Sequence, residues 1–172
     1  MEQAHELVLY LPRYAELPAL GLYLEQTTDY LNEQLAPLED VRLTSAMVSN
    51  YVKHHLIERP VKKLYGQEQL ADLVFIAVAK NVLPLADLRV AVRIQQNSRF
   101  SRAEAYDYFC QELEAAVQVV FAGQPASFPN VRTDQQKMLH HLALAIVYKA
   151  SVDRFFAATA ELQDEEGENG VH

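Results

Sequence analysis

The sequence has one cysteine, five glycines and no tryptophan among its 172 residues. Cys110 cannot form a disulfide within the chain, and its neighbours Tyr106, Phe109 and Leu113 lie at helical spacing, which predicts a buried, unreactive thiol. No apolar run approaches the roughly 20 residues that a membrane span needs. No basic stretch followed by an apolar block marks a signal peptide. We therefore expect a cytoplasmic protein with no membrane partner.

The scarcity of glycine coincides with the absence of glycine-containing catalytic and nucleotide-binding motifs. The chain contains no G-x-S-x-G, no Walker loop and no G-x-G-x-x-G. The pairs His54-His55 and His140-His141 are adjacent and lack the i, i+4 spacing of metal ligands on a helix. Glu25, Asp29 and Glu33 lie at i, i+4 spacing, which is more typical of an exposed helix face than of catalytic carboxylates. We expect no enzymatic activity, no metal site and no cofactor.

Basic residues are also few, with 15 Lys and Arg against 23 Asp and Glu and a net charge of −8. For nucleic-acid binding, the distribution of charge along the chain matters more than the net charge. Between residues 42 and 65, five basic residues and one acid give a net charge of +4, which leaves −12 for the rest of the chain. The five are Arg42, Lys53, Arg59, Lys62 and Lys63. One basic segment therefore stands within an acidic chain.

Apolar spacing predicts an all-α fold. Thr44, Ser101 and Thr133 are suited to cap helices, and Glu104 completes a capping box with Ser101. The segment before residue 20 contains two prolines and is expected to be an ordered but irregular arm. Helices are expected over residues 20–35, 45–53, 67–80, 85–96, from Ser101 to near Gly123, and from Thr133 to about Leu162.

Residues 44–65 combine the features that DNA binding requires. A major groove admits one helix, and helix 45–53 has an apolar face, formed by Met47, Val48 and Tyr51, opposite a short polar face. After Pro60, two lysines follow where they could reach phosphates, and phosphate contacts position a protein on DNA. On the pattern alone, an ordinary solvated helix is the more common interpretation.

A family resemblance favours DNA binding. The run from Met47 to Ile57, M-V-S-N-Y-V-K-H-H-L-I, resembles the recognition-helix signature T-L-R-Y-Y-E-x-x-G-L-I of MerR-type regulators. The register continues through Pro60, Lys63-Leu64-Tyr65 and the next helix, so that it covers about residues 44–92. The whole chain, with Leu11-Pro12-x-Tyr14 in the arm and Asn50-Tyr51-Val52-Lys53 at the centre, is similar to a bacterial family of unknown function assigned a MerR-like helix-turn-helix.

The resemblance implies a winged helix-turn-helix that binds double-stranded DNA. Ser45, Ser49 and Asn50 are predicted to face the bases, and Asn pairs naturally with adenine. Phosphates are predicted to contact Lys53, His54, Arg59, Lys62 and Lys63, and the predicted DNA-binding set also includes Thr44, Tyr51 and Tyr65.

Several positions depart from the MerR pattern. Ser49 replaces the arginine, and Asn50 replaces the first of the paired tyrosines. His55 replaces the glycine before Leu-Ile, which predicts loss of the left-handed helix cap that glycine permits. The wing is expected to be short, at residues 61–64. The gap over residues 35–44 exceeds a tight helix-turn-helix connection.

These patterns predict three regions: the arm and MerR-like unit over residues 1–96, a C-terminal helical hairpin for packing or dimerisation over 97–162, and an acidic disordered tail over 163–172.

The predicted function is a DNA-binding transcriptional regulator that acts as a homodimer, because helix-turn-helix proteins usually bind two half-sites. The alternative is a non-catalytic protein-interaction adaptor that retains the helix-turn-helix scaffold. The acidic chain, together with Ser49 and His55, favours that alternative. The sequence does not identify an effector.

Overall fold

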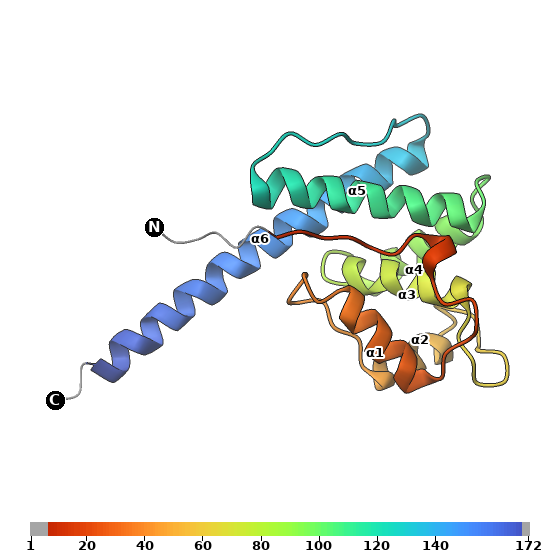
Figure 1. The fold of residues 1–172 in the computed structure, drawn as a ribbon, viewed down its shortest axis with the longest axis horizontal. Coiled ribbons are helices and arrows are strands. Elements are labelled where there is room, and N and C mark those ends of the chain that lie inside the picture. The colour runs from red at the N-terminus through yellow and green to blue at the C-terminus, as the bar shows by residue number, and fades with distance from the viewer. Residues whose placement is uncertain (1–6, 170–172) are drawn as a thin grey trace.

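The computed structural model describes residues 7–169, and side-chain surroundings as far as residue 161. Within that part the chain forms helices and no β-strand, which confirms the all-α prediction. A short 3₁₀ helix, Tyr14–Glu16, precedes α1 (Leu24–Gln34), α2 (Ser45–Lys53), α3 (Gln67–Ala79), α4 (Leu85–Gln96), α5 (Arg102–Ala122) and α6 (Asp134–Asn169) (Figure 1). None of the described helices is both long and apolar enough to cross a membrane.

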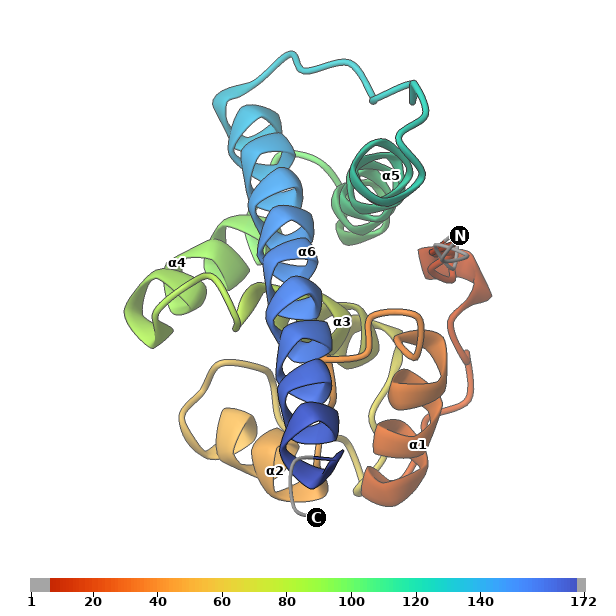
Figure 2. The same ribbon diagram turned by 90° about the vertical axis from the view of Figure 1, so that its left-hand side faces the viewer.

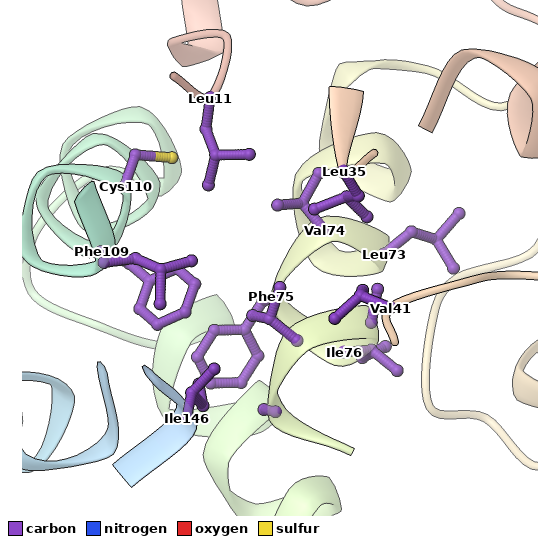
Figure 3. Packing of buried hydrophobic residues seen from close by; sticks show 14 of the residues in the cluster. Leu11, Leu35, Val41, Leu73, Val74, Phe75, Ile76, Phe109, Cys110 and Ile146 are labelled. Atoms are coloured by element: carbon purple, nitrogen blue, oxygen red, sulfur yellow. The ribbon is translucent and has the colours of Figure 1, made fainter. Parts of the chain in front are cut away.

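The central element is α3. Every residue from Gln69 to Ala79 is buried, so α3 is covered on all sides. A helix that is apolar all round must be enclosed by neighbours, and α1, α4, α5 and α6 enclose it (Figure 2). Phe75 of α3 packs edge to face on Phe109 of α5, with ring centroids 4.9 Å apart (Figure 3).

The N-terminal arm is ordered and irregular, as predicted. The backbone N–H of Leu11 donates to Glu114 Oε1 at 2.8 Å, and the Tyr106 hydroxyl donates to the carbonyl of Pro12 at 2.9 Å. Glu114 also pairs with Arg13 at 2.7 Å. These bonds fix the arm along α5. One hydrophobic cluster therefore contains residues from the arm, from α3 and from α6, on both sides of the boundary expected near residue 96.

Cys110 lies inside this cluster (Figure 3) and has no exposed surface. Burial raises the pKa of its thiol to about 12. The prediction of a buried cysteine is confirmed, and a thiol that stays protonated is a poor nucleophile.

The arrangement of α5 and α6 corrects the predicted hairpin. Contacts advance along both helices together: Glu112 Oε2 lies 2.7 Å from His140 Nδ1, and Phe121 lies under Arg154 at 4.9 Å. The helices therefore run in the same direction, whereas a helical hairpin is antiparallel. The length of the connection between α5 and α6 explains why they can run in the same direction. Residues 123–133 can span about 36 Å, which is enough to return along the roughly 32 Å of α5 (Figures 1 and 2).

The end of α6 also differs from prediction. The helix continues to Asn169, past the expected end at Leu162. Residues 163–169, predicted to be disordered, are therefore helical, and the last three residues of that prediction lie outside the described part. This stretch has no proline and is rich in Glu, which propagates a helix well.

The C-terminus of α2 contradicts a further prediction. His55 has φ of 57°, the left-handed conformation that its replacement of glycine was expected to abolish. The N–H of His55 donates to the carbonyl of Val52 at 3.1 Å, and the N–H of Leu56 donates to the carbonyl of Tyr51 at 2.8 Å. These are the paired hydrogen bonds of a Schellman motif. Leu56 and Ile57 are each 3% exposed. Their burial holds His55 in a conformation that costs a Cβ-bearing residue roughly 1–2 kcal/mol.

We expect His55→Gly to raise the free energy of unfolding by about 1 kcal/mol, because glycine adopts this conformation without the Cβ clash. Urea unfolding measures the change. His54→Gly is the matched control, because His54 has φ of −91°. Glycine there should instead lower stability by roughly 0.5–1 kcal/mol. Equal effects of the two substitutions would contradict the strain at His55.

A buried carboxylate ties α3 to α4 and α5. Asp72 Oδ2 accepts a hydrogen bond from Gln96 Nε2 at 2.9 Å and lies 3.4 Å from Arg102 Nη1. The same guanidinium lies 3.7 Å from Glu68 and 3.6 Å from Glu58. Burial raises the pKa of Asp72 to about 6, even though Gln96 and Arg102 oppose that shift.

This pKa predicts a pH dependence of stability. An unfolded Asp titrates near about 3.9, so between that value and about 6 the folded chain binds more protons. The stabilisation from this group is therefore complete below about pH 4 and is lost as the pH rises through about 6, with an upper limit of about 3 kcal/mol. Asp72→Asn should remove this fall in the unfolding free energy, measured by urea unfolding across that range. Glu68→Gln, at a more exposed partner of Arg102, should retain it. An unchanged profile in Asp72→Asn would contradict the assignment.

Candidate nucleic-acid interface

The helix α2 has one buried and one exposed face, as predicted. The Thr44 hydroxyl accepts a hydrogen bond from the Met47 N–H at 3.2 Å, which confirms the expected N-cap. Val48 is completely buried, and Met47 and Tyr51 pack partly buried against the core. The exposed face carries Ser49, Asn50 and Lys53.

The long connection between α1 and α2 is held rigidly. The Asn32 amide donates to the carbonyl of Leu43 and accepts from its N–H, both at 2.8 Å. Leu38, Val41 and Leu43 are buried. Although residues 35–44 exceed a tight turn, these contacts fix where α2 begins.

A two-residue hairpin follows α2. Val61 and Leu64 exchange backbone hydrogen bonds of 3.1 and 2.9 Å, and Lys62 and Lys63 form the tip. Their φ angles are 50° and 67°, as in the type I′ turns that usually contain Asn and Gly. Both lysines are exposed. Strained backbone held by its surroundings is concentrated at functional sites, so this tip is a candidate contact.

The base of the hairpin packs against the arm. Leu22 and Tyr65 exchange backbone hydrogen bonds of 3.0 and 2.8 Å, and this pairing keeps the arm extended, so that α1 starts at Leu24 rather than near residue 20. A Cβ on Gly21 would lie 2.6 Å from Leu64 Cβ, so only glycine permits this approach. Tyr65 is 5% exposed. Its side chain therefore supports the hairpin from inside, and its place in the predicted DNA-binding set is corrected.

The other predicted residues surround the end of α2. His54 is exposed, and its carbonyl accepts a 2.7 Å hydrogen bond from Arg89 of α4. Arg59 is exposed, Ser45 is partly buried, and burial raises the pKa of the half-buried Tyr51. In both ribbon views α2 and the yellow loop before α3 lie at the same end of the molecule (Figures 1 and 2). The fold thus brings the exposed face of α2 and the lysine tip to one end.

A second basic surface was missed by sequence reasoning. A hollow of about 1050 Å³ lies between α4, the linker to α5 and the start of α6. Within the described part of the chain its four cations form no ion pair. It is lined by the basic residues Arg93, Arg99, Arg132 and Lys137, by the acid Asp134, and by apolar residues that include Val90, Ile94, Phe100 and Val131. We call it the basic groove. Its cations come from three separate stretches, so no local charge window could reveal it.

Comparison with known proteins places most of this arrangement in one family. Residues 12–109 match the family described as Domain of unknown function (DUF1836). The match contains most of the arm, α1 to α4, the lysine hairpin and the first part of α5. No curated protein and no solved structure matches the chain. Because the match covers more than half of its length, the chain belongs to the DUF1836 family.

Proposed function

We propose that this protein is a DNA-binding transcriptional regulator that inserts α2 into the major groove of double-stranded DNA. The observation that carries the proposal is the exposed polar face of a capped helix beside a hairpin tipped by two lysines. The order of α1, α2, hairpin, α3 and α4 matches the order that the resemblance to MerR-type regulators implies. This agreement supports reading residues 61–64 as a minimal wing.

Charge supports the same orientation. The basic segment carries +4 in a chain of net charge −8. Phosphates attract the basic segment and repel the acidic remainder, so electrostatics favour approach with α2 and the hairpin foremost. Ser45, Ser49 and Asn50 read bases, while Lys53, His54, Arg59, Lys62 and Lys63 hold phosphates. Helix-turn-helix proteins usually occupy two half-sites, so the proposed DNA-bound form is a homodimer.

Lys62→Ala combined with Lys63→Ala should weaken binding on every DNA sequence. Loss of two phosphate contacts should flatten the slope of log K against log salt concentration by about 2 units. Fluorescence anisotropy over a salt series measures it. The control is Arg99→Ala, which removes an exposed cation of the basic groove and should leave the slope unchanged. An unchanged slope in the double variant would remove the hairpin from the interface.

Asn50→Ala should relax specificity at one or two base pairs, at a cost of roughly 1–3 kcal/mol on the preferred sequence. Selection of bound duplexes from a random pool measures the change in preference. Lys53→Ala is the comparison on the same helix, because loss of a phosphate contact weakens all sequences about equally. A uniform loss in Asn50→Ala would contradict its role in reading bases.

The basic groove favours a second candidate function, a protein-interaction adaptor. Its lining combines apolar and cationic side chains, which fits an acidic amphipathic peptide. The duplex selection separates the two candidates: an enriched motif supports the regulator. No enrichment, together with binding of an acidic amphipathic peptide that Arg93→Glu and Arg132→Glu abolish, would favour the adaptor.

A further inference from the structure

From Tyr148 onward, α6 has an apolar face that the rest of the described chain leaves uncovered. Tyr148, Val152, Phe155 and Phe156 are 55%, 50%, 67% and 64% exposed. Arg154 on the other side of the helix still contacts Phe121 of α5 and the carbonyl of Pro37, and the end of α6 projects beyond the body (Figure 1). The Phe155 and Phe156 rings lie 5.5 Å apart and form one aromatic surface. Contiguous exposed apolar side chains mark interaction sites, and a projecting helix gains most of its stability from packing.

The spacing of this face is that of a coiled coil. Ala145, Tyr148, Val152, Phe155 and Thr159 follow one another by alternating steps of three and four residues, the a and d spacing of a heptad. We call these five residues the α6 seam. At 3.6 residues per turn, the seam lies opposite the side of α6 that packs on the body through buried Leu139, Ala143 and Ile146. The seam is therefore free to receive another helix along its length.

We infer that the α6 seam pairs with the α6 seam of a second copy of this chain, in antiparallel orientation. The inference names the interface of the homodimer in the proposed function, and it does not depend on DNA binding. A two-fold interface must be self-complementary. With the axis between Val152 and Phe155, these two residues face each other across copies, and Tyr148 faces Thr159.

Charge selects the antiparallel orientation. Five acids lie between Glu161 and Glu168, whereas the stretch from Arg132 to Lys137, around the start of α6, carries two cations and one acid, Asp134. Parallel helices would place the two acidic ends side by side, which is destabilising. In the antiparallel pair, residues 161–168 of one copy lie along residues 139–146 of the other, beside Lys137. The same charge asymmetry makes a second copy a better occupant than an unrelated apolar helix.

Sedimentation equilibrium of the full chain tests the pairing. The wild type should sediment at twice the chain mass of 19.5 kDa. Val152→Glu with Phe155→Glu should raise the dimer dissociation constant by at least about 100-fold, because both residues are proposed interface anchors. The matched control is Ala157→Glu, an exposed position on the opposite side of α6, which should remain dimeric. Far-UV circular dichroism checks that each variant is folded. A monomeric wild type at its highest soluble concentration would overturn the proposal, as would a control that dissociates equally.

Disulfide cross-linking tests the orientation. Chains carrying Tyr148→Cys are mixed with chains carrying Thr159→Cys, and diamide is added as the oxidant. Two thiols give up two protons and two electrons to form one disulfide, and diamide takes them up and is reduced to its hydrazine. Antiparallel pairing should link the two variants to each other, whereas parallel pairing would link each variant to itself. Cys110 is buried and should not react. Preferential self-linkage would overturn the antiparallel arrangement. Neither experiment contains DNA, so their failure would leave the α2 experiments standing.

Discussion

The complete burial of α3 is the constraint on which the other elements depend. Burying a large apolar side chain contributes roughly 1.5–3 kcal/mol, and α3 contains such residues around its whole circumference. The surrounding helices must therefore enclose it, and residues from the arm to α6 form one cluster. Contacts with this core also determine where the candidate interface lies. Gln67, at the first turn of α3, donates to the carbonyl of Leu17 at 2.9 Å, and so fixes the arm beside the base of the hairpin.

Strained backbone falls within the candidate interface. The non-glycine residues with positive φ in the described chain are His55, Lys62 and Lys63, all of them between α2 and α3. Buried Leu56, Ile57 and Tyr65 alternate with these positions and hold the backbone in place. A segment anchored by its buried residues can present its exposed side chains in a fixed geometry. Preorganisation of this kind lowers the entropy lost on binding, whichever partner the surface meets.

Electrostatics divide the molecule into parts with different roles. The segment from residue 42 to 65 is basic, the basic groove gathers four cations near the start of α6, and the far end of α6 is acidic. Inside, the Asp72 carboxylate is kept beside Arg102 at a cost in solvation that raises its pKa to about 6. Charged groups of opposite sign therefore lie on separate parts of the surface, while the Asp72–Arg102 pair links α3 to α5.

The sequence by itself determined the features that depend on short-range interactions. Interactions with neighbours within one or two turns account for the spans of α2 to α5, the Thr44 and Ser101–Glu104 caps, the buried Cys110 and the exposed face of α2. Tertiary structure decided the rest. The left-handed His55 depends on burial of the residues after it, and the shared direction of α5 and α6 depends on the reach of residues 123–133. The basic groove and the exposure of the α6 seam depend on which distant segments meet, and local periodicity carries no information about that.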